Sequence, residues 1–139
     1  MRVVVDTNVL VSGLINMHNA PGRIIDRLRG ERLKLVVDDR ILGAYRDVLF
    51  RERLRAWFTE QDARDLMTFL DYESERVLAG IAIQGLPDPE DAPFLEVALS
   101  AGCPLVTGNA KHYPKSLRSG VTVLTPAEFM SGSCNDHNT

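Results

Sequence analysis

The sequence opens with three consecutive valines, residues 3–5, which are followed directly by Asp6. Consecutive β-branched apolar residues are typical of a strand that is buried on both faces, as in a parallel sheet covered by helices. Asp6 stands where this strand should end, and an unpaired carboxylate beside a buried strand costs free energy to desolvate. We therefore expect Asp6 either to cap a following helix or to take part in chemistry.

Strand patterns and helical stripes then alternate along the chain. Short apolar runs predict strands over residues 33–37, 104–106 and 121–124, and residues 78–84 add a further strand-like stretch. Apolar residues at helical spacing predict helices that include residues 9–15, 24–28, 41–49, 63–70 and 94–99. This alternation indicates an α/β protein, a three-layer α/β/α sandwich with a mostly parallel central sheet.

Polar residues at the expected helix starts support these boundaries. Thr7 or Asn8 can cap the first helix, Asp38 or Asp39 a later one, and Thr59 another. Residues 18–22 are expected to form a loop, and residues 125–128 form a capping box with proline in the first turn. We expect one folded domain over residues 1–130 and a disordered tail over residues 131–139.

Composition limits the class of protein. A chain of 139 residues with 45% hydrophobic and 25% charged residues fits one globular domain. Its net charge of −3 means that nucleic acid must be bound through a local basic patch and not through the overall field. The absence of a signal peptide or a membrane-spanning apolar run predicts a cytoplasmic protein without membrane contact. Cys103 and Cys134 lack zinc-site or disulfide-framework spacing, so we expect both to be reduced.

Residues 50–59 contain one candidate basic patch. The segment interleaves arginines with apolar residues, namely Arg51, Arg53, Arg55, Leu54, Trp57 and Phe58. Such a cluster can meet the phosphates and bases of a single strand. It can equally be a helix end whose apolar side chains complete the core while its arginines stay in solvent.

Polar residues also gather where the carboxyl edge of the sheet is expected, which is where open α/β sheets bind ligands. Asp6 and the Thr107-Gly108-Asn109 turn belong to this edge, and the turn over residues 85–91 brings three acids to the start of a helix. A dinucleotide fold is excluded because no glycine-rich turn follows the first strand. A haloacid-dehalogenase-type phosphatase requires a second aspartate where this chain has Asn8.

A set of short motifs along nearly the whole chain resembles the PIN-domain nucleases, in particular the branch of toxin components of toxin-antitoxin pairs. The matching segments are residues 5–12 (VDTNVLVS), 20–22 (APG), 38–42 (DDRIL), 45–49 (YRDVL), 87–91 (PDPED), 94–98 (FLEVA), 105–109 (LVTGN) and 125–129 (TPAEF). Each segment is a weak signal alone, whereas their order and spacing together are specific.

The resemblance implies magnesium- or manganese-dependent cleavage of single-stranded RNA. It implies Asp6 and Asp91 as catalytic acids, and Asp6, Asp88, Asp91 and Asn109 as the metal-binding set. Magnesium prefers oxygen ligands, keeps several waters and neutralises charge on a phosphate, which agrees with these residue types. The resemblance also implies a cognate antitoxin protein, and it leaves open whether the chain forms a homodimer.

The chain departs from the family pattern at two positions. Ala44 stands where the family usually has a glutamate, and Asn109 where many members have an aspartate. Asp47, one helical turn beyond Ala44, can lean towards the site, although a solvated Asp47 fits its spacing better.

Further polar residues can support the acids or the substrate. Thr7, Asn8, Ser12 and Thr107 are expected to hold ligating carboxylates or phosphate oxygens, or to act only in caps and turns. Lys111 and His112 can contact the RNA backbone, or can belong to a solvated loop. Two functions therefore remain: a metal-dependent endoribonuclease toxin, or a catalytically weakened PIN-fold module that binds RNA or a protein partner.

Overall fold

The computed structural model describes the backbone of residues 1–136 and the side chains of residues 1–132. The strands are β1 (Arg2–Val5), β2 (Lys34–Val37), β3 (Glu75–Arg76), β4 (Leu105–Val106) and β5 (Val123–Leu124). They form a sheet in the order β3-β2-β1-β4-β5, and every neighbouring pair is parallel. The parallel sheet expected from the sequence is confirmed.

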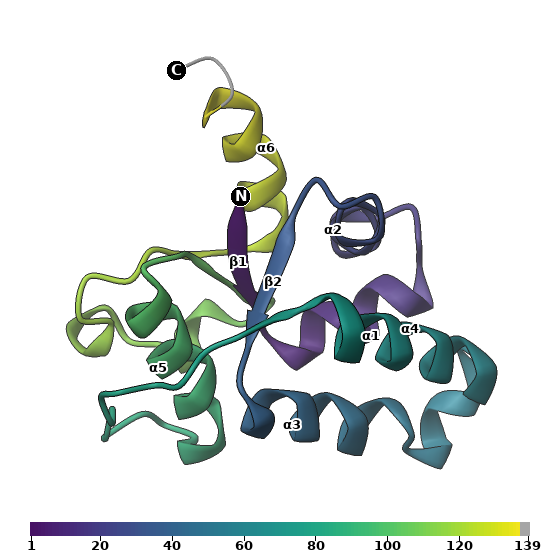
Figure 1. Ribbon diagram of the computed structural model, residues 1–139, viewed down its shortest axis with the longest axis horizontal. Helices are drawn as coiled ribbons and strands as arrows, with labels where there is room; N and C mark the ends of the chain where they lie inside the picture. The colour runs from purple at the N-terminus through teal and green to yellow at the C-terminus, as the bar shows by residue number, and fades with distance from the viewer. Residues whose placement is uncertain (137–139) are drawn as a thin grey trace.

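Helices cover both faces of this sheet. The α-helices are α1 (Thr7–Ile15), α2 (Ala20–Arg29), α3 (Asp39–Leu49), α4 (Glu60–Glu73), α5 (Ala92–Ala101) and α6 (Pro126–Asp136). Short 3-10 helices are η1 (Glu52–Ala56), η2 (Pro89–Asp91), η3 (Ala110–His112) and η4 (Lys115–Leu117). Figure 1 shows α5 on one side of β1 and β2, with α1, α2 and α4 on the other side. The three-layer α/β/α fold is confirmed.

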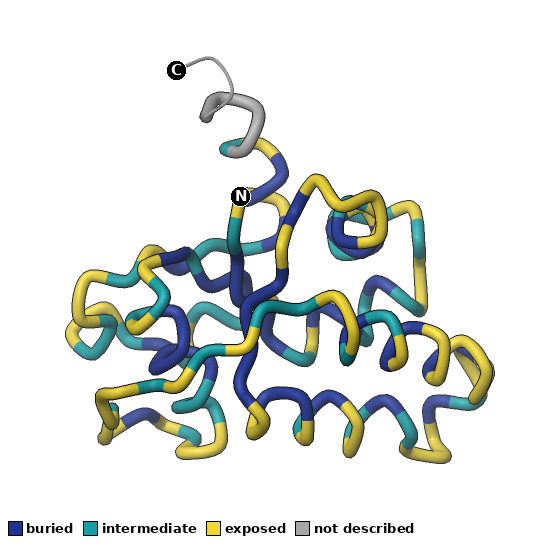
Figure 2. The backbone as a smooth tube through the Cα atoms, in the orientation of Figure 1, coloured by how far each residue is buried: buried dark blue, intermediate teal, exposed yellow. Residues whose placement is uncertain are grey.

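The centre of the sheet forms the core, as the dark blue strands in Figure 2 show. The three valines of β1 are fully buried, and so are Val36 and Val37 of β2. Tyr45 of α3 is also fully buried, and its hydroxyl donates a 2.5 Å hydrogen bond to the carbonyl of Val5. This bond ties α3 to the end of β1. Within the part of the chain that is described, no helix is long and apolar enough to cross a membrane.

Three of the predicted helix caps are present. Asp38 accepts a hydrogen bond from the backbone nitrogen of Ile41 at 3.0 Å, which caps α3. Thr59 forms a reciprocal capping box at the start of α4. Thr125 and Glu128 form another at the start of α6, with bonds of 2.8 and 3.1 Å. These local signals were readable in the sequence because each depends on residues within one turn.

The structure differs from the expected elements in three places. Residues 78–84 contain no strand, and β3 lies earlier, where Glu75 pairs with Val36. The expected loop over residues 18–22 ends early, because Asn19 caps α2 and Ala20 begins it. Helix α6 continues past the boundary expected at residue 130 as far as Asp136, and residues 137–139 lie outside the described part.

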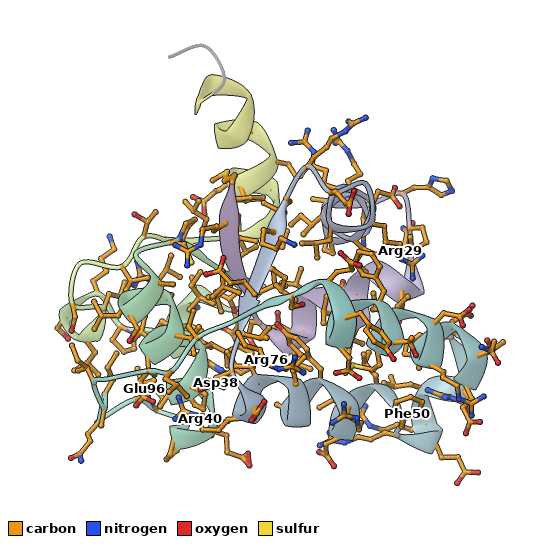
Figure 3. The ribbon with its side chains drawn as sticks, in the orientation of Figure 1. Arg29, Asp38, Arg40, Phe50, Arg76 and Glu96 are labelled. Carbon is orange, nitrogen blue, oxygen red and sulfur yellow. The ribbon has the colours of Figure 1, made fainter. Side chains whose placement is uncertain are left out.

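Helix α5 anchors the irregular segment that precedes the acidic turn. Glu96 is buried, and its Oε2 accepts a 2.7 Å hydrogen bond from the backbone nitrogen of Ile83. Its Oε1 accepts a 2.7 Å bond from Arg40, which also pairs with Asp38 (Figure 3). One buried carboxylate therefore links α5, the start of α3 and the segment that leads to η2.

Candidate functional site

Asp6 lies at the carboxyl end of β1, between the ends of β1 and β4. Its residue is 5% exposed, and its Oδ2 accepts hydrogen bonds from the hydroxyls of Thr107 at 2.8 Å and Tyr113 at 3.0 Å. Burial raises the pKa of Asp6, and these two hydrogen bonds oppose that rise. No lysine or arginine of the described residues pairs with this carboxylate. Asp6 is therefore held in place by neutral donors and keeps its charge uncompensated.

The expectation that Thr7 or Asn8 caps α1 is wrong. Asp6 occupies the capping position, but its side chain makes no capping bond, because both of its described side-chain donors approach from the β4 region. Asn8 instead holds the turn after β4, since its Oδ1 accepts a 3.0 Å bond from the backbone nitrogen of Gly108. A Cβ atom at Gly108 would lie 3.2 Å from that oxygen, so glycine permits this close contact.

Asp91 lies at the junction of η2 and α5. Its side chain is 14% exposed, and its Oδ2 lies 3.1 Å from Nδ1 of His112. Burial raises the pKa of Asp91 to about 6, with further contributions from the negative charges of Asp6 and Asp88 and an opposing effect of His112. The effect of Asp6 on Asp91 means that these two carboxylates, distant in the sequence, share one electrostatic environment.

Asp6 and Asp91 line the same cleft, which has a volume of about 540 Å³. Acids on its lining include Asp88 and Glu90, and the sequence pattern did not mark Glu90 as a site residue. The remaining lining residues come from α1, from α3 and the segment after it, and from the neighbourhood of α5: Thr7, Asn8, Val11, Ser12, Ile15, Ala44, Asp47, Val48, Arg51, Arg53, Leu54, Phe94 and His112. The cleft thus joins the acids to the basic segment.

The helix position that the family resemblance assigns to a glutamate does face this cleft. Ala44 lines it and is half-buried. Asp47 also reaches the lining, but its side chain is 72% exposed and pairs with Arg51 at 2.9 Å. Position 44 therefore contributes a methyl group to the cleft where the family resemblance assigns a further carboxylate.

The basic segment is divided between core and surface. Leu54 and Phe58 are buried, whereas Trp57 is 62% exposed. Arg53 lines the cleft, is exposed, and forms no hydrogen bond or ion pair with the described residues. The interpretation that apolar residues of this segment complete the core is confirmed for Leu54 and Phe58. The interpretation that the segment binds nucleic acid stays a prediction, for which Arg53 and Trp57 are the exposed candidates.

Other predicted residues are placed less directly. Asp88 caps η2 by accepting a 2.9 Å bond from the backbone nitrogen of Glu90, and it lines the cleft as well. Asn109 directs its amide nitrogen at His112 and does not line the cleft, and Lys111 is absent from the lining too. Tyr113 is a supporting residue that sequence reasoning missed, since nothing local marks a buried tyrosine as a partner of Asp6.

Two carboxylates with no lysine or arginine partner fit a divalent cation. Magnesium is often held by one or two carboxylates together with waters, and mutual repulsion between acids is relieved when a cation binds. Among the described residues, no group of three aspartate, glutamate, histidine or cysteine side chains forms a ready-made metal cage. The donor set is therefore a minimal one.

Comparison with known proteins gives concordant results. The sequence profile of the PIN domain matches residues 2–111. An uncharacterized protein of Methanocaldococcus jannaschii is 26% identical over 139 aligned positions, which cover 94% of this chain and 90% of the relative. A chain in the crystal structure of VapBC2 from Rickettsia felis, bound to a DNA fragment from their promoter, superposes with a TM-score of 0.55. The superposition covers 90% of this chain and 98% of that chain at 14% identity, and it supports the fold alone.

Proposed function

This chain belongs to the PIN domain family, and on that premise we propose that it is a metal-dependent endoribonuclease that cleaves single-stranded RNA. The observation that carries the proposal is the meeting of Asp6 and Asp91 in one cleft, where neither has an arginine or lysine partner among the described residues. A buried carboxylate without a cationic partner, such as Asp6, costs stability, which makes it a candidate for a role in chemistry.

The metal would be magnesium or manganese. Asp6 and Asp91 would hold it, and Asp88 would contact it through water. When bound, such an ion neutralises charge on the phosphate that is cleaved and orients the attacking water. Thr107 and Tyr113 fix Asp6 from behind by binding its Oδ2, so the carboxylate needs no rearrangement to accept a cation.

The substrate would lie along the cleft. Arg53 is a cation without a protein partner among the described residues, and it lines the same cleft as the acids. We assign it to a phosphate of the RNA strand that neighbours the cleaved one. The exposed ring of Trp57, just beyond η1, can stack on an unpaired base. This division into phosphate and base contacts favours a single strand over a duplex, whose bases are already stacked.

We further infer that the protein acts in the cytoplasm as the toxin of a toxin-antitoxin pair, and that a small antitoxin covers the cleft. The support is the order of the family motifs. The similar chain in the Rickettsia felis VapBC2 structure adds only an analogy of fold.

A second function is favoured by one observation. Ala44 lines the cleft where a glutamate would add a further carboxylate, and the lack of that charge weakens the hold on a cation. The second candidate is therefore a PIN-fold module with weakened catalysis, which binds RNA or a protein partner.

The test is RNA cleavage by the purified chain across a manganese titration. Fluorescently labelled single-stranded and duplex RNAs of the same sequence would be compared, with chelator and Asp6→Asn as controls. Cleavage of the single strand that requires both metal and Asp6 supports the ribonuclease. Binding of RNA without cleavage at any metal concentration supports the binding module, and cleavage that survives both chelator and Asp6→Asn contradicts the proposed chemistry.

A further inference from the structure

The side chains of Asn109 and His112 form a hydrogen-bonded chain that ends on Asp91. Nδ2 of Asn109 lies 2.9 Å from Nε2 of His112, and Nδ1 of the same ring lies 3.1 Å from Oδ2 of Asp91. The backbone nitrogen of Asn109 donates to Thr107 Oγ1 at 3.1 Å, and that hydroxyl donates to Asp6. The chain of contacts therefore connects the supports of both acids.

Proton counting assigns the direction of these bonds. An ionised carboxylate only accepts, so Nδ1 of His112 must carry the hydrogen that faces Asp91. A neutral imidazole has a single N–H, so Nε2 must then accept a hydrogen bond. The amide nitrogen of Asn109 is a donor and meets that requirement. Each atom in the chain has a complementary partner when the ring is in its Nδ1–H form.

An aspartate at position 109 would give a different arrangement. A carboxylate there accepts only, and a ring between two carboxylates favours the cationic form with a hydrogen on both nitrogens. The ring would then place a positive charge beside Asp91, where it would compete with a metal ion. The amide of Asn109 is thus matched to a neutral ring that donates to Asp91.

We propose that Asn109 and His112 are positioning residues, in which the amide of Asn109 sets the Nδ1–H tautomer of His112 and the ring then fixes Asp91 for a divalent cation. This proposal rests on the metal site of the proposed function, and it does not depend on RNA being the substrate. The pair uses only Oδ2 of Asp91, and the other oxygen accepts no hydrogen bond from the described side chains. Asn109 therefore acts behind His112, in place of the metal contact expected from the sequence.

The first test reads the tautomer directly. Nitrogen-15 NMR of the full-length, metal-free protein distinguishes a protonated ring nitrogen from an unprotonated one, and the His112 signals are identified by their loss in His112→Leu. We expect a protonated Nδ1 and an unprotonated Nε2 in the wild type, and hydrogens on both ring nitrogens in Asn109→Asp. A wild-type ring protonated at Nε2, or an unchanged ring in Asn109→Asp, overturns the proposal.

The second test reads the consequence for the metal, with manganese binding by calorimetry in the absence of RNA. His112→Asn keeps a donor close to the position of Nδ1, whereas His112→Leu has a similar size and no donor. Loss of a supporting residue of this kind typically weakens metal affinity about 10- to 100-fold. We expect that loss in His112→Leu, near-wild-type affinity in His112→Asn, and no change in the exposed control His18→Leu.

The two variants of His112 separate the possible failures. Equal manganese affinity of His112→Leu and His112→Asn overturns the positioning role. If manganese binds and responds as expected but no RNA is cleaved, the positioning role stands and the ribonuclease proposal fails. If a variant does not fold, as judged by its melting transition, the wild-type NMR measurement still shows whether Nδ1 of His112 carries the hydrogen, as the proposal requires.

Discussion

Asp6 and Asp38 follow the same local sequence, two valines at the end of a central strand, and their surroundings differ. Asp38 uses one oxygen to cap α3 through Ile41 and the other to pair with Arg40 at 2.7 Å. Asp6 caps nothing with its side chain, and the donors on it are two hydroxyls. Both residues are nearly buried, at 5% and 8% exposure.

Asp6 and Asp38 differ in whether a nearby positive charge balances the carboxylate. Asp38 has a cation and a helix start beside it, and a carboxylate in that setting stabilises the fold. Asp6 has neutral donors and a second acid, Asp91, whose pKa it raises. The same residue at the same edge of a sheet is thus structural in one place and a candidate for metal binding in the other, and the charge of its neighbours separates the two roles.

The sharpest test exchanges each carboxylate for its amide. We expect Asp6→Asn to lower metal-dependent RNA cleavage by at least about 100-fold, since a first ligand contributes several kcal/mol to charge stabilisation. The melting temperature of the metal-free protein should stay the same or rise, because one repelling charge is removed. Asp38→Asn is the matched control and should keep its cleavage rate. Equal loss of cleavage in Asp6→Asn and Asp38→Asn would contradict the assignment of Asp6 to metal binding and of Asp38 to structure.

The converse test measures stability by urea unfolding. Asp38→Ala removes the cap of α3 and the partner of Arg40, and we expect a loss of about 2 kcal/mol in the free energy of unfolding. Asp38→Asn retains a capping oxygen and should lose less. Asp6→Ala is the comparison, and a loss from it as large as that from Asp38→Ala would show that Asp6 is needed chiefly for folding.

The pH dependence of the metal-free protein follows from the pKa of Asp91, raised from 3.8 to about 6. The folded state holds this proton more tightly than the unfolded state, so the free energy of unfolding falls as pH rises from about 4 to about 6 and stays lower above that range. We expect a fall of about 1 to 2 kcal/mol after solvent screening. The measurement is urea unfolding at several pH values with chelator present. In Asp91→Asn the free energy of unfolding should no longer fall between about pH 4 and about pH 6, whereas in Asp38→Asn it should still fall.

The smallest expected effect concerns the missing acid. Ala44→Glu places a carboxylate in the cleft, which should tighten manganese binding by on the order of 1 kcal/mol. The same change should lower the melting temperature of the metal-free protein, because the added carboxylate is repelled by the acids already in the cleft. Ala44→Gln is the uncharged control. If both variants behave alike at every manganese concentration, position 44 does not influence the ion.

The sequence predicted the parts of the fold that depend on local patterns. The valines of β1 and β2 identified buried parallel strands, and Thr59 and Thr125 identified helix starts, because each signal needs only neighbouring residues. The apolar residues 78–84 misled the strand prediction. Leu78 is 94% exposed, and the position of β3 is set by pairing with β2, which no local pattern contains.

The residues of the candidate site also fall into those that the sequence identified and those that only the structure shows. Asp6 was identifiable from its position at the end of a buried strand, and Asp91 from the family resemblance, and the structure brings both to one cleft. Tyr113 was not identifiable, because its contact with Asp6 joins residues 107 positions apart. The contact between Asn109 and His112 was equally hidden, since it depends on how the turn after β4 places the two side chains.

The buried carboxylate of Glu96 has a consequence for motion. The segment from residue 77 to residue 88 has no regular secondary structure, and one of its few attachments is the bond from the nitrogen of Ile83 to Glu96. That amide should exchange with deuterated solvent far more slowly than its neighbours. When it does exchange, the bond to Glu96 has opened, and the segment that leads to Asp88 has lost one of its attachments to α5. The exchange rate of a single amide therefore reports how often this attachment opens.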